Sequence, residues 1–241
     1  MGQRLSLRST ILTTATACLL ACHPATINDA SETDTVVTRK AESYDYSGNR
    51  TYDIPDSIAD LCEVDSGRLP IGEAGASGND RPERPDAGSL DCNEITHKFD
   101  EAVLKEIRSN FEKLGYVRIH TDADNKPDVA VLVGAISSNN WVAYTYYPWY
   151  YYGYWWPYYP PGWGVYYPYY PVTSVVNYPT GTLMIDLVSV KDADPEAERT
   201  PVIWTASIAG LLAQGDTDTV TRVNQTIDQA FAQSQYLKVK P

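Results

Sequence analysis

Residues 144–170 form a tract rich in tyrosine, tryptophan and proline near the middle of the chain. Seventeen of these twenty-seven residues are Tyr or Trp, and no charged residue occurs between positions 129 and 185. The prolines of the tract are Pro148, Pro157, Pro160, Pro161 and Pro168. Proline inside a helix removes a backbone donor and collides with the preceding turn. The prolines therefore argue against one continuous helix in this tract, and so against a transmembrane helix.

The composition of the tract favours a long hairpin excursion, spanning 144–179, that is ordered by ring stacking on itself and on a sheet. Two functional interpretations compete with this structural one. Tyr and Trp rings are apolar with a polar edge, so the tract could lie at a lipid headgroup boundary. Alternatively, the rings form a platform for sugar rings, peptidoglycan or a protein partner, because aromatic side chains dominate interface hot spots. The candidate contact residues are Trp141, Trp149, Trp155, Trp156 and Trp163.

Strand patterns lie on both sides of the tract. The segment 129–136 is apolar and rich in β-branched residues, which is typical of a buried strand. The acidic segment 191–200 separates two further strand patterns and predicts a hairpin. Near the start of the chain, aromatic and polar residues alternate around Ser-Gly-Asn and predict a strand or strand pair. The predicted strands are 44–52, 116–120, 129–136, 182–190 and 202–209.

Two segments have the periodicity of amphipathic helices. In 92–114, apolar residues recur every three or four positions and make one apolar face. Asp91 and Glu94 are spaced as a capping box at the start of this helix, and Gly115 followed by Tyr116 fits its end. The second helix begins near Asp216 or Asp218. Its apolar face is made by Val220, Val223, Ile227, Ala230 and Phe231.

The predicted order of elements is strand, helix, several antiparallel strands, helix. Two helices with one apolar stripe each can cover one face of a sheet. We therefore predict an α+β fold in which an antiparallel sheet of four to six strands is covered on one side by two amphipathic helices. It forms a single domain at 44–236, with loop insertions at 63–91 and 144–179.

The first 22 residues read as an export signal. Arg4 and Arg8 precede a short uncharged stretch at 9–21, which is too short to span a bilayer. Its end, Leu-Leu-Ala-Cys22, resembles the lipobox of bacterial lipoproteins. That resemblance implies cleavage before Cys22, a diacylglycerol on the Cys22 thiol and an acylated amine, which together anchor a chain stably. The alternative is an ordinary signal peptide at 1–21 with an incidental cysteine.

The segment after Cys22 predicts a tether. Residues 22–43 are polar and acidic, with little hydrophobic periodicity, so we expect a flexible connection to the membrane. His23 follows Cys22 where an Asp would resemble an inner-membrane retention signal. The sequence therefore favours a lipid-anchored protein of the cell envelope, at the outer membrane.

Cys62 and Cys92 flank the insertion at 63–91, which is rich in Gly, Pro, Asp and Arg. After export they are the only cysteines besides the one that carries lipid. An even remainder in an oxidising compartment predicts a disulfide between them. Two unrelated thiols, or half of a metal site, are the alternatives.

The composition and motifs exclude several function classes. Thirty-one acidic against nineteen basic residues, a net charge of −12, argue against nucleic-acid binding. The three histidines, His23, His97 and His120, have no metal-ligand spacing, and no nucleophile elbow or phosphate-binding glycine loop occurs. We expect no catalytic residue, no metal and no cofactor. Asp186, in the middle of a predicted strand, is interpreted as a solvent-facing or edge-guarding charge.

The strand Gly181-Thr-Leu-Met-Ile-Asp-Leu-Val188, with Trp204-Thr-Ala-Ser and a terminal helix after it, resembles a family of bacterial lipoproteins called domain of unknown function 4136. The opening Tyr46-Ser-Gly-Asn-Arg-Thr-Tyr52 and the Gly115-Tyr116 helix end also fit, and the resemblance covers about 44–234. Members often carry a glycine-rich or aromatic-rich stretch before the Gly-Thr-Leu strand. The insertion at 63–91, the long acidic hairpin and Trp204-Thr-Ala depart from the family pattern. The resemblance implies a fold and an envelope address, and no activity.

The functional hypothesis is a non-catalytic, lipid-anchored envelope protein that uses the aromatic tract as an interaction or structural surface. Its partners are the membrane, through the lipid, and an envelope protein or a glycan. A peptidoglycan-binding or glycan-binding lipoprotein is the alternative. A hydrolase with a spatially assembled site is a third hypothesis.

Overall fold

The fold is that of a computed structural model of the 241-residue chain. The structure describes residues 34–61, 97–121, 124–136, 141–143, 146–148, 164–168, 176–178, 181–209 and 218–240. For the strands at 141–143, 146–148 and 176–178, it describes the backbone alone.

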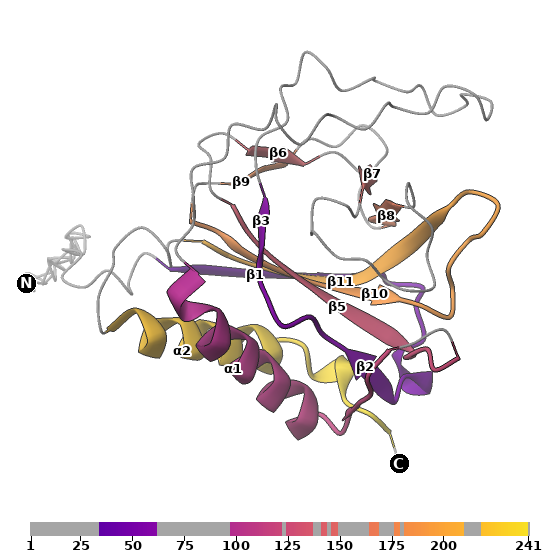
Figure 1. The fold of residues 1–241 in the computed structure, drawn as a ribbon, viewed down its shortest axis with the longest axis horizontal. Coiled ribbons are helices and arrows are strands. Elements are labelled where there is room, and N and C mark those ends of the chain that lie inside the picture. The colour runs from indigo at the N-terminus through magenta and orange to yellow at the C-terminus, as the bar shows by residue number, and fades with distance from the viewer. Residues whose placement is uncertain are drawn as a thin grey trace, which may run out of the picture.

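Four antiparallel strands form the centre of the sheet (Figure 1). In spatial order they are β5 (Val129–Ile136), β10 (Leu183–Ser189), β11 (Arg199–Ala209) and β1 (Thr35–Lys40). Every residue of β5 and β10 is buried, as expected for strands that are covered on both faces. The structure confirms the strands predicted at 129–136 and 182–190 and the hairpin between β10 and β11. β11 begins at Arg199, three residues before the predicted start at 202.

Short strands extend the sheet beyond β5. β2 (Thr51–Asp53) and β3 (Ala59–Leu61) pair with β5 in parallel, and β4 (Val117–Arg118) pairs with β2 in parallel. With β7 (Tyr146–Pro148) and β8 (Gly164–Tyr166), the described residues make a mixed sheet of nine strands. The α+β class is confirmed, but the sheet is larger than predicted. β2 and β4 overlap the strands predicted at 44–52 and 116–120, whereas β3, β7 and β8 were not predicted as separate strands, because pairing between segments distant in sequence leaves no local pattern.

The strands predicted at 44–52 and 116–120 are shorter than expected. Tyr46–Gly48 forms a 3-10 turn, η2, and the Asp45 carboxylate accepts the backbone N–H of Ser47 at 2.9 Å. The alternation of aromatic and polar residues therefore belongs to a turn, and only β2 after it is a strand.

Both helices lie on one face of the sheet (Figure 1). α1 (Asp100–Lys113) follows a 3-10 turn, η4 (His97–Phe99), and α2 (Asp218–Ala232) precedes another, η6 (Gln235–Leu237). The Asn110 amide of α1 donates to the Asp228 carboxylate of α2 at 2.8 Å, so the two helices are in direct contact. The predicted helix 92–114 is confirmed at 97–113, as η4 followed by α1, and residues 92–96 lie outside the described residues. Asp91 and Glu94, the predicted capping box, lie outside the described residues.

The end of α1 is the glycine termination predicted from the sequence. Gly115 has a φ of +92°, its N–H donates to the Glu112 carbonyl, and the Tyr116 N–H donates to the Phe111 carbonyl at 3.0 Å. A Cβ on Gly115 would come within 3.3 Å of the Val239 Cβ. The positive φ and this close packing both favour glycine at the helix end.

Part of the segment predicted to be a flexible tether forms the strand β1. Its residues pair with β11 in the register Thr35 opposite Ala209 to Lys40 opposite Trp204. Val36 packs against the core, whereas Val37 on the other face is 40% exposed. The prediction of a flexible tether is therefore wrong for 34–40. An edge strand with one half-buried face needs few apolar residues, so its sequence resembles that of a linker.

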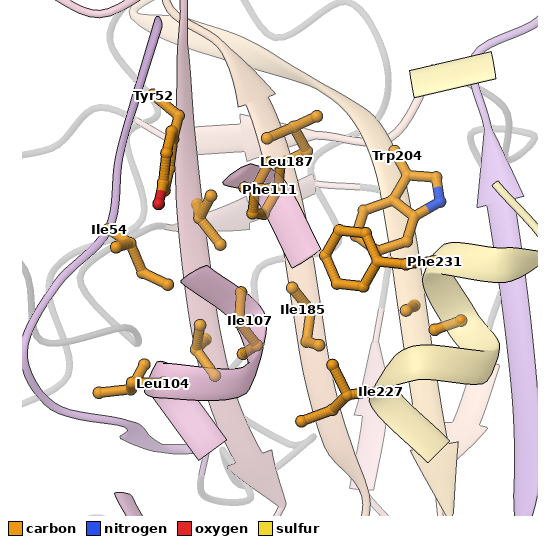
Figure 2. Packing of buried hydrophobic residues seen from close by; sticks show 14 of the residues in the cluster. Tyr52, Ile54, Leu104, Ile107, Phe111, Ile185, Leu187, Trp204, Ile227 and Phe231 are labelled. Carbon is orange, nitrogen blue, oxygen red and sulfur yellow. The ribbon is translucent and has the colours of Figure 1, made fainter. Parts of the chain in front are cut away.

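The hydrophobic core lies between the sheet and the helices, and Phe111 is near its centre (Figure 2). Its buried ring stacks on Tyr52 with centroids 4.9 Å apart and meets Phe231 edge-on at 5.1 Å. Burial raises the pKa of the Tyr52 phenol to about 12. Ile185 and Leu187 reach this core from β10. Since side chains alternate along a strand, Asp186 between them lies on the opposite face.

Candidate functional site on the second face of the sheet

Most of the predicted site residues lie outside the described residues. These are Cys22, Cys62, Cys92, Trp149, Trp155, Trp156 and Trp163. Trp141 begins β6 (Trp141–Ala143), of which the backbone alone is described. Lipidation, the disulfide and the Trp contacts therefore stay predictions. The structure describes the frame to which the aromatic tract is attached.

Two short antiparallel ladders form this frame. β6 pairs with β9 (Val176–Tyr178), with Trp141 opposite Tyr178. β7 and β8 lie between β6 and β9 in the sequence, and they pair with each other, with Pro148 opposite Gly164. The ladders are thus nested, and residues 149–163 connect the two strands of the inner one. This arrangement agrees with the predicted hairpin excursion.

β8 attaches the inner ladder to the large sheet. It pairs with β11 in parallel, from Gly164 opposite Arg199 to Tyr166 opposite Pro201, and the Gly164 N–H donates to the Glu198 carbonyl at 2.9 Å. Figure 1 shows β7 and β8 on the side of the sheet opposite the helices. The return strand of the aromatic tract is therefore joined to the sheet at the start of β11, and Tyr167, just after β8, covers Asp186 on the face opposite the helices.

Side chains alternate inward and outward in and just after β8. Val165 and Tyr167 are buried, whereas Tyr166 is partly exposed and carries the Arg199 guanidinium 4.5 Å above its ring. This cation–π contact covers the outer surface of the β8–β11 junction. The inner residues face the sheet.

Asp186 is the polar centre of this second face. Its Oδ2 accepts the Tyr167 hydroxyl at 2.7 Å, and its Oδ1 accepts the Thr205 hydroxyl at 2.5 Å. Asp186 is fully buried, and Tyr167 is 4% exposed. Its neighbour across the sheet on β5 is the buried Leu132. The prediction that Asp186 is a solvent-facing or edge-guarding charge is wrong, because β10 is a central strand with both faces covered.

Asp186, Tyr167 and Thr205 form a buried hydrogen-bonded group, the Asp186 cluster, whose arrangement suits a structural role. Both carboxylate oxygens already accept hydrogen bonds from buried hydroxyls, and the residue has no exposed surface through which a substrate could reach it. A buried carboxylate needs such donors, because burying its charge without them costs several kcal/mol. The chemistry of this cluster is thus the fixing of one segment on another.

The comparisons with known proteins agree with this geometry. The model of the family described as "Domain of unknown function (DUF4136)" matches residues 36–234, a range that begins inside β1 and ends after α2. The chain belongs to the DUF4136 family. Among curated proteins, none matches it.

Solved structures resemble this DUF4136 chain to different degrees. The crystal structure of a DUF4136 family protein from Bacteroides thetaiotaomicron aligns with a TM-score of 0.55 at 22% identity, covering 86% of this chain and 98% of that one. This likeness shows a shared fold. The PelC dodecamer from Paraburkholderia phytofirmans aligns over 86% of this chain and 99% of its own, with a TM-score of 0.33 at 14% identity. A likeness this low supports no further conclusion.

Residues 46–52, the opening segment that also fits the family pattern, form a structural corner in this DUF4136 domain. The Tyr46 hydroxyl donates to the Ile203 carbonyl of β11, and Asn49 is fully buried and accepts the Tyr44 hydroxyl at 2.9 Å. Gly48 lies against the Lys191 side chain, whose Nζ would be 3.1 Å from a Cβ there. These residues pack the first turn onto the β10–β11 hairpin.

The Asp128 carboxylate joins this corner to β5. Its Oδ2 accepts the backbone N–H groups of Arg50 and Thr51 and the Thr51 hydroxyl at 2.8–2.9 Å. Burial opposes ionisation of Asp128, but the hydrogen bonds from Arg50 and Thr51 outweigh it and lower its pKa. The carboxylate therefore holds the start of β2 beside the start of β5.

A histidine between two carboxylates lies at the start of α1. The His97 Nδ1 is 2.9 Å from Asp100 Oδ2, and its Nε2 is 3.5 Å from Asp60 Oδ2. The hydrogen bond to Asp100 is the main reason that the His97 pKa is raised. The spacing of histidines cannot reveal this site. The His-x-x-Asp spacing of His97 and Asp100 is the only local signal for it, and Asp60 comes from β3.

Two further properties concern the described residues as a whole. They hold no group of three or more His, Cys, Asp and Glu side chains that is suited to a metal ion. No helix in the described ranges is long and apolar enough to cross a membrane.

Proposed function

We propose that this DUF4136 protein is a non-catalytic lipoprotein of the cell envelope, anchored at the outer membrane through Cys22, that presents its aromatic tract to a partner. The sequence support is the Leu-Leu-Ala-Cys22 motif after the basic Arg4 and Arg8. The structural support is the attachment of the tract to the sheet through β7, β8 and the Asp186 cluster.

The fold limits how far the domain can be from its anchor. Eleven residues, 23–33, separate Cys22 from Asp34, whose carboxylate is bound to Arg222 of α2. Fully extended, this segment spans about 40 Å, and as a flexible chain about 18 Å. The start of β1 is therefore the part of the domain that the chain connects most directly to the anchor.

The position of β8 on β11 carries the proposal. Thr35, at the start of β1, is opposite Ala209, whereas Tyr166 of β8 is opposite Pro201. These two points on β11 are eight residues apart, or about 26 Å along a strand. Figure 1 shows β8 and the start of β1 toward opposite ends of the sheet. Pro148 and Gly164, from which segment 149–163 departs, thus lie at the end away from the anchor.

This placement favours a partner over the anchoring lipid as the target of the aromatic rings. A contact with lipid headgroups would require the tether to fold back along the length of the sheet. An envelope protein is the partner that best suits an uncharged surface rich in Tyr and Trp, because such side chains are enriched at the centres of protein interfaces.

The anchor is tested by labelling with radioactive palmitate. Label enters the wild type and is lost in Cys22→Ala, which keeps the rest of the signal sequence. Equal labelling of both proteins contradicts the anchor. Intact-mass measurement of the purified membrane form provides a second reading, since cleavage before Cys22 removes residues 1–21.

The contact surface is tested with a minimal hairpin. Because Pro148 is opposite Gly164, replacing residues 149–163 by Asn-Gly closes β7 and β8 with a two-residue turn and removes four tryptophans. A photoreactive residue at position 166 captures an envelope protein in the wild type and loses it in the minimal hairpin. The control is the same group at Val117, which is 60% exposed on β4. Capture of lipid alone, or unchanged capture by the minimal hairpin, contradicts the proposal. Pull-down on cell-wall material that depends on 149–163 supports the glycan alternative instead.

A further inference from the structure

The sequence of β8 and the residues after it specifies only weakly the register in which β8 pairs with β11. In 164–170, four of seven residues are tyrosine, and Val165 is the only aliphatic residue of the whole tract 144–170. Shifting a strand by one residue turns every side chain to the other face. In a chain of repeated tyrosines, such a shift replaces one aromatic ring by another, so hydrophobic contact alone discriminates weakly between registers.

The sheet beneath supplies a feature that does discriminate. Asp186 lies in a strand whose residues are all buried, beside Leu132 of β5 and with Met184 and Val188 on the same face of β10. In these apolar surroundings its carboxylate oxygens require donors. Thr205 of β11 supplies one from the sheet itself, and Tyr167 supplies the other from the tract.

Only one register of β8 provides a donor to Asp186, buries Val165 and keeps the strand pairing. With Tyr166 opposite Pro201, Val165 and Tyr167 face inward, and the Tyr167 hydroxyl is 2.7 Å from Asp186 Oδ2. A shift of one residue in one direction puts Pro168, which has no donor, over Asp186. In the other direction it puts Tyr166 over Asp186, but it leaves Gly164 in the buried site of Val165 and turns Val165 outward. A shift of two in one direction puts Val165 where Tyr167 is, which removes the donor. A shift of two in the other direction forces the Tyr167 ring into the space of Val165.

We propose that Asp186 is a positioning residue that fixes the register of β8 through its hydrogen bond to Tyr167, and thereby fixes where the aromatic segment leaves the sheet. An apolar side chain at 186 would avoid burying a charge, and replacing buried charged groups by apolar ones is often neutral or stabilising. The carboxylate thus serves the specificity of one arrangement. This inference rests on the proposed function and deepens it, because Gly164, at the start of β8, is where the proposed contact surface joins the sheet.

The test is amide hydrogen exchange, read by mass spectrometry, on the purified full chain. Tyr167→Phe removes one hydroxyl and keeps the ring. We expect exchange to become at least tenfold faster in the peptides that cover 164–168 and 199–201, while the peptides of α1 and β5 keep their wild-type rates. The matched control is Tyr166→Phe, which keeps the ring over Arg199 and is expected to leave all rates within twofold.

A second variant keeps the inference testable if the first folds poorly. Asp186→Leu keeps a branched side chain of similar shape and removes both acceptor oxygens, and we expect it to accelerate exchange in the same two peptides. Because both substitutions remove the hydrogen bond between Tyr167 and residue 186, the double variant Asp186→Leu with Tyr167→Phe should exchange no faster than the faster single variant. Unchanged exchange at 164–168, equal acceleration in β5, or multiplied effects in the double variant would overturn the inference. Neither lipid nor partner enters this experiment, so its outcome is separate from that of the palmitate and capture tests.

Discussion

The Arg222 guanidinium donates two hydrogen bonds to the Asp34 carboxylate immediately before β1 begins. Nε is 3.1 Å from Oδ2, and Nη2 is 2.5 Å from Oδ1. The side chains of Arg222 and Asp34 are only 11% and 3% exposed. This bidentate pair attaches the start of the edge strand to α2, so the domain begins earlier in the sequence than its hydrophobic pattern indicates.

Removing one member of this pair leaves the other buried and uncompensated. We expect Arg222→Ala to lower the free energy of unfolding by about 3 kcal/mol, measured by urea denaturation. The comparison is Glu42→Ala, which breaks the exposed Lys40–Glu42 pair, 3.1 Å apart with side chains 37% and 81% exposed. That change should cost about 0.5 kcal/mol or less. Similar costs for the two variants contradict the assignment of Arg222 as a structural anchor.

The parts of this fold that are predictable from sequence are those whose burial follows a local period. The apolar run of β5, the strand of Asp186 with its hairpin, and the glycine end of α1 at Gly115 are all of this kind. β1 is not, because half of its side chains face outward and its pairing with β11 is long-range. A period-two pattern with two apolar residues is shared by many linkers.

The candidate site was less predictable than the fold, for the same reason. Tyr167 is one of thirteen tyrosines in 144–170, and nothing local distinguishes it from its neighbours. Asp186 is conspicuous in an apolar strand, but its role depends on whether a second layer covers it. Only the pairing of β8 with β11 brings Tyr167 over that carboxylate. Long-range strand pairing is the information that a local reading lacks.

Asp128 gives the corner at 46–52 a defined dependence on pH. Its pKa is lowered in the folded protein, so its contribution to stability is complete above the unfolded value, about 3.9, and is lost as the pH falls through the folded value. We expect Asp128→Asn to cost about 2 kcal/mol at pH 7, since three hydrogen bonds to a charged acceptor are weakened. The cost should shrink below about pH 4, measured by urea denaturation across this range.

The control for this pH series is Glu196→Gln, on the exposed β10–β11 hairpin. It should differ from the wild type by about 0.5 kcal/mol or less at every pH. A cost for Asp128→Asn that stays constant down to pH 2 would show that its carboxylate acts through packing rather than through charge.

Gly134 of β5 is required because the Leu61 side chain of the neighbouring strand β3 lies directly against it. A Cβ at this position would be 2.6 Å from both Cγ and Cδ1 of the buried Leu61. We expect Gly134→Ala to cost about 2 kcal/mol and Leu61→Ala about 3 kcal/mol. In the double variant, the smaller side chain at 61 makes room for the new methyl group. The combined cost should then be at least about 1 kcal/mol below the sum of the two.

This double-mutant cycle has its own control at Gly48. A Cβ there would meet only the Lys191 Nζ, at 3.1 Å, and the end of a flexible lysine can move away. Gly48→Ala is therefore expected to change the free energy of unfolding by about 0.5 kcal/mol or less. Additive costs for Gly134→Ala and Leu61→Ala would mean that the clash is relieved elsewhere.

Phe111 of α1 packs against aromatic rings from several elements of the core. Its ring contacts Tyr52 of β2, Tyr116 after the helix and Phe231 of α2, with centroids 4.9, 5.3 and 5.1 Å away. We expect Phe111→Ala to cost about 4 kcal/mol, because the cavity is surrounded by rings held by several elements and cannot collapse. Phe99→Ala, at the partly buried start of α1, removes the same ring and should cost about 1 kcal/mol. Thermal unfolding and the near-ultraviolet circular dichroism of the tyrosines measure both effects. Equal costs for the two phenylalanines would mean that the stacked rings add nothing beyond the helix contact itself.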